Sequence, residues 1–140
     1  MIVHPAVIVH GLADAQAVLA VGAPVTLLSA PGAAIYAGCL WWRELVAAAR
    51  RGGPPDAVMT DVLDCGDAPG QAMAALRSGV PRLVLAEGPA WAAVAQIARH
   101  QGGFLLQQAP PALDMADRRA PVRLCDWLRP GTRDAAVDAG

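Results

Sequence analysis

The segment between residues 61 and 67 carries the densest set of groups that can do chemistry. Asp61, Asp64 and Asp67 recur at three-residue spacing, and carboxylate oxygens are ligands that Mg²⁺ takes. Structural roles compete with this interpretation. Asp67 can cap a helix that begins at Pro69, and Asp61 lies inside an apolar run, where a carboxylate needs a partner. We therefore predict a functional site near this segment, but no metal site.

Cys65, in the same segment, is a candidate nucleophile. A cysteine attacks as the thiolate, which a helix N-terminus or a nearby histidine favours. His10 follows the first apolar run and can serve as an acid, a base or a partner for an anion. A centre of His10, Asp64 and Cys65 would suit a hydrolase or a lyase. The alternatives are that Cys65 is a small buried filler and that His10 pairs with Asp64 or a backbone carbonyl.

Two turns rich in small residues form a second candidate feature. Residues 29–33 read Ser-Ala-Pro-Gly-Ala, and residues 67–71 read Asp-Ala-Pro-Gly-Gln. Small residues let an anion approach the amides at the start of a helix. Neither turn is a dinucleotide fingerprint or a P-loop, so a tight strand-to-helix turn is the alternative.

Short apolar runs alternate with alanine-rich stretches along the chain. The apolar runs predict strands at 6–10, 25–29, 57–63, 82–86 and 104–107. The alanine-rich stretches predict helices at 12–21, 34–51, 69–78 and 89–100, each followed by glycine or proline. We also expect a helix near 113–119 and a short element near 122–128.

The apolar runs are nearly continuous, which is typical of a parallel sheet covered on both faces. We predict a single doubly wound, five-stranded, flavodoxin-like α/β sheet. The sequence does not determine its strand order, which is 2-1-3-4-5 in flavodoxins. A half (β/α)8 barrel is the alternative, since such a barrel also begins with consecutive βα units. In either fold, ligands bind beyond the C-terminal ends of the strands. The residues predicted to bind a ligand there are Ser29, Gly32, Asp61, Asp67, Gly70 and Glu87.

The chain of 140 residues is predicted to hold one α/β domain over residues 1–113. Residues 114–140 are rich in Asp and Arg, and we expect a charged, partly ordered tail whose last ten residues are loose. The first 113 residues carry few charges, which indicates an apolar surface that a subunit interface would cover. We therefore expect a homo-oligomer, most simply a homodimer.

Composition excludes several classes of function. The chain has no lysine, which excludes Schiff-base enzymes and P-loop nucleotide binding. A net charge of -1 gives no basic footprint for nucleic acid. No apolar run is long enough to span a membrane, and the N-terminus lacks the basic region of a secretory signal. Three cysteines without metal-ligand spacing indicate reduced thiols and a cytoplasmic protein. No motif identifies a cofactor.

Two stretches, LLSAPGAAIYAGCLWW (27–42) and LDCGDAPGQAMAALRSG (63–79), resemble a group of small uncharacterised α/β proteins of high-GC bacteria. The resemblance covers most of residues 6–113. It implies the fold and no particular activity.

Three functions remain open at this level. The first is a module that binds a small anionic ligand at the C-terminal ends of the strands. The second is a lysine-independent hydrolase or lyase centred on Cys65, Asp64 and His10. The third is a protein-interaction module built on the apolar body and on Trp41 and Trp42, which as neighbours on a helix cannot both face one core.

Overall fold

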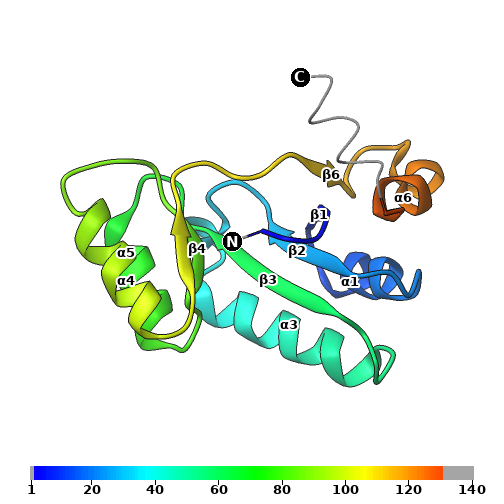
Figure 1. Ribbon diagram of the computed structural model, residues 1–140, viewed down its shortest axis with the longest axis horizontal. Coiled ribbons are helices and arrows are strands. Elements are labelled where there is room, and N and C mark those ends of the chain that lie inside the picture. The colour runs from blue at the N-terminus through cyan, green and yellow to red at the C-terminus, as the bar shows by residue number, and fades with distance from the viewer. Residues whose placement is uncertain (1, 131–140) are drawn as a thin grey trace.

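A computed structural model describes residues 2–130 of the chain. Its helices are α1 (Leu12–Leu19), α2 (Ala33–Tyr36), α3 (Cys39–Gly52), α4 (Pro69–Arg77), α5 (Trp91–His100) and α6 (Ala120–Leu128). Its strands are β1 (Ala6–Val9), β2 (Val25–Ser29), β3 (Met59–Asp64), β4 (Arg82–Val84), β5 (Phe104–Leu106) and β6 (Ala112–Asp114). Strands and helices alternate over most of the described chain (Figure 1).

The strands form one parallel sheet, so the predicted α/β class is confirmed. The sheet has six strands rather than five, and their order is β5-β4-β3-β2-β1-β6. This order differs from the order 2-1-3-4-5 of flavodoxins. The consecutive order of β1 to β5 is instead the order that the half-barrel alternative predicts.

The main core lies between the sheet and a single layer of helices. Side chains at alternate strand positions, including Val7, Leu27, Leu63 and Leu83, pack in one buried cluster with all the longer helices. Consecutive parallel strands joined by right-handed crossovers place their helices on the same face. The helices therefore cover one face of the sheet and do not sandwich it, which departs from the doubly wound prediction.

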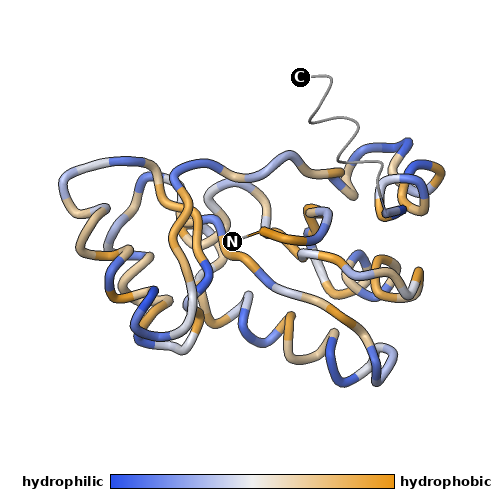
Figure 2. The backbone as a smooth tube through the Cα atoms, viewed as in Figure 1, coloured by the Kyte–Doolittle hydropathy of each residue, from blue (hydrophilic) through white to orange (hydrophobic). Residues whose placement is uncertain are grey.

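The opposite face carries a smaller apolar cluster. Leu28, Val62 and Val84 are buried there, with Ile8 and Phe104 packed against them. Apolar residues on both faces explain why the strands read as nearly continuous apolar runs. Figure 2 shows the strands as mainly hydrophobic segments of the backbone tube, with polar stretches in the connections.

Residues 107–111 join the two outermost strands, and we call them the crossing segment (Figure 1). The outer strands of a flat six-stranded sheet would lie about 24 Å apart. The six Cα steps from Leu106 to Ala112 reach at most about 22 Å when fully extended. The sheet must therefore be bowed. Its smaller apolar cluster lies on the face that does not carry the helices.

The helix predicted over 113–119 is not found. The first residues of the charged tail instead form a strand and, further on, a helix. Leu113 is instead in strand β6 and pairs with Val7 of β1, so the predicted domain boundary at residue 113 falls inside a strand. Helix α6 follows at Ala120–Leu128, and the indole Nε1 of Trp127 donates to the Ala6 carbonyl oxygen at 2.8 Å. The expectation that the last ten residues are loose lies outside the described residues.

The long helix predicted over 34–51 is two helices in the structure. Gly38 separates α2 from α3 with φ of 91°, a left-handed conformation that glycine adopts without a steric penalty. Trp42 is fully buried, and Trp41 is partly buried against the same core. The expectation that these two neighbours cannot both face one core is therefore wrong. No helix in residues 2–130 is long and apolar enough to cross a bilayer.

Candidate functional site

The C-terminal ends of the parallel strands lie along one edge of the sheet, where α/β proteins bind ligands. Most of the residues predicted from the sequence follow these strand ends. Among them are His10 after β1, Ser29 at the end of β2, Asp64 at the end of β3 and Glu87 beyond β4. What each side chain contacts decides which of them is available to a ligand.

Asp64 is buried and holds two loops together. Its Oδ1 accepts the amide of Gly32 at 3.1 Å and the amide of Gly66 at 2.8 Å. Both glycines have left-handed backbones, with φ of 68° and 58°. The Gly32 amide was predicted to bind an external anion, but the protein supplies its own anion to that amide.

The Ser29 hydroxyl also makes its hydrogen bonds within the protein. Its hydroxyl donates to the Ala30 carbonyl oxygen at 3.2 Å and accepts the backbone amide of Asp64 at 2.9 Å. The side chain is buried, so it ties β2 to β3 instead of facing a ligand. Gly70, in the first turn of α4, is exposed, and none of the contacts described here involves it.

Cys65 does not have the properties of a nucleophile. The residue is fully buried. Burial raises the pKa of its thiol from 9.0 to about 12, with further contributions from the Asp64 charge and from Cys39. A group with so high a pKa is a neutral thiol at physiological pH, so Cys65 is a core residue, as the alternative interpretation held.

Asp61 does not lie at this edge. Its carboxylate is buried and faces the helix layer, where Oδ1 accepts Arg82 Nη2 at 2.9 Å and lies 3.7 Å from Arg50 Nη2. These arginines are the partners that a carboxylate inside a strand requires. Within residues 2–130, no group of three or more Asp, Glu, His or Cys side chains gathers that could hold a metal ion, so Asp61, Asp64 and Asp67 do not converge.

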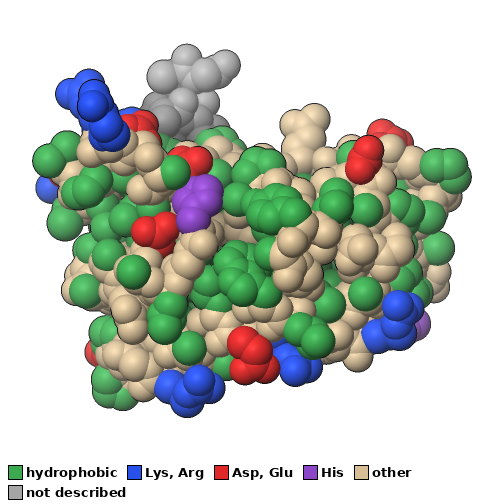
Figure 3. All heavy atoms as spheres, turned by 180° about the vertical axis from the view of Figure 1, so that it is seen from behind, with side chains coloured by type: hydrophobic (Ala, Val, Ile, Leu, Met, Phe, Trp, Pro, Cys, Tyr) green, Lys and Arg blue, Asp and Glu red, His purple; other side chains and the backbone are tan. Residues whose placement is uncertain are grey.

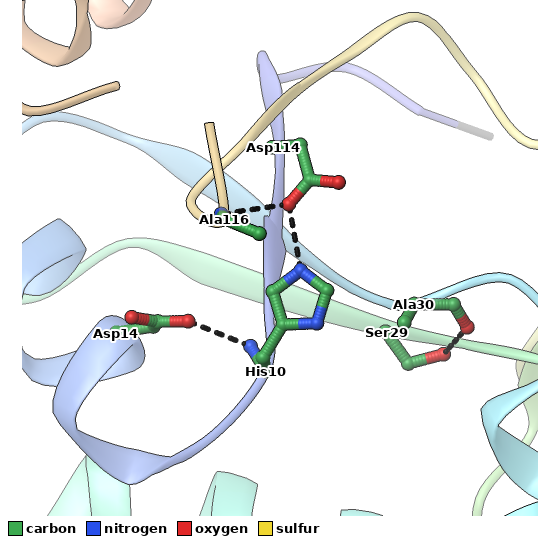
Figure 4. A network of polar contacts seen from close by, with 6 residues as sticks. All are labelled: His10, Asp14, Ser29, Ala30, Asp114 and Ala116. Carbon is green, nitrogen blue, oxygen red and sulfur yellow. Dashed lines mark hydrogen bonds and ion pairs between the residues drawn. The ribbon is translucent and has the colours of Figure 1, made fainter. Parts of the chain in front are cut away.

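His10 forms a pair with Asp114, a residue that the sequence did not single out. Nε2 of His10 lies 2.6 Å from Oδ1 of Asp114 (Figure 4). Asp114 is in β6 opposite Ile8, and side chains two positions apart on a strand share a face. The backbone amide of His10 also donates to Asp14 Oδ2 at 2.9 Å. The contact brings together residues 104 positions apart.

The chemistry of this pair follows from the hydrogen bond. A carboxylate only accepts, so Nε2 carries the proton and Nδ1 holds the lone pair when the ring is neutral. Figure 4 shows the second ring nitrogen on the side of Ser29, with no hydrogen bond joining the two residues. Both side chains of the pair remain partly exposed, at 38% for His10 and 43% for Asp114. The arrangement is that of a carboxylate-oriented general base.

The carboxyl group of Asp114 is shifted by its surroundings. Partial burial by itself raises the pKa of Asp114, but the hydrogen bonds from the Ala116 amide and from His10, together with the charge of His10, outweigh it. The pKa of Asp114 therefore lies below its ordinary value of 3.8. Asp114 is ionised at neutral pH and can hold the His10 ring in one orientation.

A pocket opens at the same edge between the β3–α4 and β4–α5 loops. Its volume is about 430 Å³, within the range of roughly 300–1,000 Å³ typical of small-molecule sites. Its apolar wall includes Leu85, Pro89 and Trp91, and its acidic groups are Asp67 and Glu87. Trp91 is held in place because its indole Nε1 donates to the Leu85 carbonyl oxygen at 2.9 Å.

The pocket and the His10–Asp114 pair are separate features. They lie at the ends of β4 and β1, which are separated by β3 and β2 in the sheet. Three strand spacings correspond to about 14 Å. Neither His10 nor Asp114 lines the pocket.

Hydrophobic side chains are also exposed on the molecule. Ile35, Tyr36 and Leu40, from α2 and the start of α3, are each more than half exposed. Figure 3 shows green hydrophobic side chains across the middle of one face, with most charged side chains toward its margins.

Searches against protein-family models and curated proteins return no match to this chain.

Proposed function

We propose that the protein binds a small organic molecule at the C-terminal edge of its sheet. The observation that carries the proposal is the pocket of about 430 Å³ between the loops that follow β3 and β4. It lies where parallel α/β sheets bind their ligands, and it combines an apolar wall with few polar groups, as small-molecule sites do.

The lining favours a particular ligand chemistry. Its ionisable residues, Asp67 and Glu87, are both acidic, and two carboxylates repel an anion. The Gly32 amide, one of the groups expected from the sequence to donate to an anion, already donates to Asp64. We therefore propose a ligand that carries an amine or several hydroxyl groups, with an apolar part against Trp91, in place of the anion suggested by the sequence.

A thermal-shift screen of small amines, polyols and carboxylates tests this proposal. A ligand at about one hundred times its dissociation constant adds about 2.7 kcal/mol to the free energy of unfolding. We expect amines or polyols to stabilise the wild-type protein, and we expect Glu87→Gln and Asp67→Asn to remove the effect. Glu44→Gln is the matched control, because Glu44 is an exposed acid on α3, outside the pocket.

Stabilisation by carboxylates alone, or stabilisation that persists in both pocket variants, would place the ligand elsewhere. No stabilisation by any compound would count against small-molecule binding at this edge.

A second candidate function is acid–base catalysis, for which the 2.6 Å contact between His10 and Asp114 is the specific observation. An imidazole oriented by a carboxylate can remove a proton from water or from a substrate. The hydrolase alternative is thus retained with His10 as the base and without Cys65.

Hydrolysis of p-nitrophenyl acetate measures such an imidazole without knowledge of the natural substrate. We expect wild type to be faster than His10→Gln, with Asp114→Asn between them. His100→Gln is the control, since His100 is exposed at the far end of α5. Equal rates in all four proteins would exclude the pair as a base.

We also propose a cytoplasmic homodimer. Three free cysteines suit a reducing compartment. The exposed Ile35, Tyr36 and Leu40 provide apolar surface that a second copy would cover. Light scattering of wild type and of Tyr36→Glu tests the dimer, and a wild-type monomer at micromolar concentration would rule it out.

A further inference from the structure

We propose that a separate surface hollow, between α3 and the start of β4, binds the phosphate group of a small molecule. The hollow has a volume of about 210 Å³. It is lined by three arginines, Arg43, Arg50 and Arg82, and by one carboxylate, that of Asp61. The proposal is independent of the pocket at the C-terminal edge, which has a different lining.

The α3 helix presents two of the arginines on one side. Arg43, Val46, Ala47 and Arg50 all line the hollow, and their spacing of three, four and seven residues is that of a single helix stripe. The third arginine, Arg82, begins β4. Two separate elements therefore direct guanidinium groups at the same space.

The positive charge in this space exceeds the negative charge. Arg82 makes the close contact with Asp61, through Nη2 to Oδ1 at 2.9 Å and through Nε to the backbone oxygen at 3.0 Å. Arg50 lies 3.7 Å from the same carboxylate. With three guanidinium groups and one carboxylate, the lining carries an excess of positive charge, which the exposed Glu44 carboxylate beside Arg43 lowers from outside the lining.

The remaining contacts of Arg43 and Arg50 are long. Arg43 reaches the Ser78 carbonyl oxygen at 3.3 Å and the exposed Glu44 carboxylate at 3.4 Å, and Arg50 reaches the Met59 carbonyl oxygen at 3.4 Å. The Arg43–Glu44 contact is an exposed ion pair, and such pairs contribute little to stability. The other two contacts are single hydrogen bonds to backbone carbonyl oxygens near the long end of the hydrogen-bond range. Both guanidinium groups can turn toward an incoming anion at small cost.

A phosphate dianion fits this charge and this space. Its negative charge is opposite in sign to the excess charge of the lining, and its oxygens accept the paired N–H groups of guanidinium bidentately. The volume of about 210 Å³ is several times the roughly 30 Å³ that a water molecule takes in the liquid. There is room for a phosphate group together with some of its water, and the open side leaves space for the rest of a phosphomonoester.

Calorimetric titration of the full chain with inorganic phosphate and with glycerol 3-phosphate tests the proposal, with acetate as the carboxylate comparison. We expect saturable binding of both phosphates, and each of Arg43→Gln and Arg50→Gln should weaken it about tenfold, since hydrogen bonds to charged groups have that order of strength. Arg99→Gln, on α5 and outside the hollow, should bind as wild type does.

Removing the negative charge of the lining should have the opposite effect on phosphate affinity to removing a positive charge. A purely structural role of these residues does not predict a gain in affinity. Asp61→Asn removes the one carboxylate of the lining and should tighten phosphate binding, with thermal denaturation used to verify that this variant is folded. If it does not fold, the Arg43 and Arg50 variants decide. Lack of saturable binding in wild type, equal affinity for acetate, or the same weakening in Arg99→Gln would overturn the proposal.

Glu87→Gln separates the two sites. It should leave phosphate binding unchanged, so either site can fail without affecting the conclusion about the other.

Discussion

Asp64 and Asp114 are both acidic residues at strand ends, and what their carboxylates meet decides their roles. Asp64 is buried and accepts two backbone amides, so it stabilises the loop structure. Asp114 is partly exposed and orients an imidazole. The same side chain is a structural anion in one place and a component of a candidate base in the other.

The cysteines should differ widely in their reactivity. Cys125 is exposed, whereas Cys39 and Cys65 are buried. Iodoacetamide, followed by peptide mass spectrometry, should label Cys125 first and Cys65 last. The pKa of Cys65 of about 12 against 9.0 lowers its thiolate fraction about a thousandfold at neutral pH.

In urea all three cysteines should react at similar rates, which provides the control. If Cys65 were labelled first in the folded protein, a thiolate centre at this position would have to be reconsidered.

The carboxyl group of Asp114 should titrate below 3.8, the ordinary value from which its pKa is lowered. An NMR titration of the carboxyl carbon measures this pKa directly. In His10→Gln the midpoint should move upward, because that variant removes the charge of the imidazole. A midpoint at or above 3.8 in wild type would contradict the 2.6 Å contact with His10.

The sign of the corresponding stability effect follows from linkage. The folded protein holds the Asp114 proton less tightly than the unfolded chain, so the contribution of Asp114 is complete above the unfolded pKa. It is lost as the pH falls through the lower folded pKa. Asp114→Asn should therefore be less stable than wild type at neutral pH, and the difference should shrink in acid.

At the level of elements, two glycines show how the turns position the sheet. A Cβ atom at Gly103 would lie 2.1 Å from the Pro81 carbonyl oxygen, whereas a Cβ at Gly70 would meet nothing within 4 Å. That carbonyl oxygen also accepts the Phe104 amide, the bond that begins the pairing of β5 with β4. Close backbone approach, not a positive φ, accounts for the glycine at position 103.

Gly103→Ala should lower the free energy of unfolding by about 3 kcal/mol or more, because the clash is with backbone that cannot move freely. Gly70→Ala is the matched control. It lies in the first turn of α4 and should raise the free energy of unfolding by no more than about 0.5–1 kcal/mol through helix propensity. Urea denaturation measures both, and equal effects would mean that β5 does not begin where the structure places it.

The helix starts are also informative. The sequence predicted the strand-to-helix turns through their proline and small residues, and α4 does begin at Pro69. It did not predict the break at Gly38, because residues 34–51 read as one alanine-rich amphipathic stretch and a single glycine inside a helical pattern is usually tolerated. Ile35, Tyr36 and Leu40, which lie on either side of this break, are exposed.

At the scale of the whole molecule, helix α6 packs against strand β1, which is far from it in the chain. The Trp127 indole donates to the Ala6 carbonyl oxygen, and Leu124 and Leu128 are buried in the main core. Residues beyond the predicted domain boundary therefore complete the core and the sheet. The pairing of β6 with β1 also brings Asp114 to His10.

Substitution of Trp127 tests this closure. Trp127→Phe keeps most of the packing but loses the hydrogen bond, and should cost about 1 kcal/mol. Trp127→Ala should cost about 2–3 kcal/mol, below the range for a fully buried aromatic residue. Val122→Ala, on the exposed side of the same helix, should change the free energy of unfolding by less than about 0.5 kcal/mol.

Chemical denaturation followed by tryptophan fluorescence provides these values. If Trp127→Ala behaved like Val122→Ala, α6 would not be part of the cooperative unit.

The sequence by itself determined the α/β class, the position of strands β1 to β5 and the edge of the sheet at which polar residues gather. Local patterns suffice for these, since apolar runs, helical spacing and turn residues act over a few positions. It also placed Asp67 and Glu87 at strand ends, where the structure brings them into one pocket.

Only the tertiary structure decided the strand order, the side chain that pairs with His10 and the acceptor of the Gly32 amide. Each depends on residues far apart in the chain: Asp114 is 104 positions from His10, and Asp64 is 32 from Gly32. Such contacts follow from the order in which the strands pair. The short crossing segment (residues 107–111) bows the sheet and places β6 beside β1. Local propensity does not encode that choice, because the three residues Ala-Leu-Asp of β6 are too short a segment to specify which edge of the sheet they join.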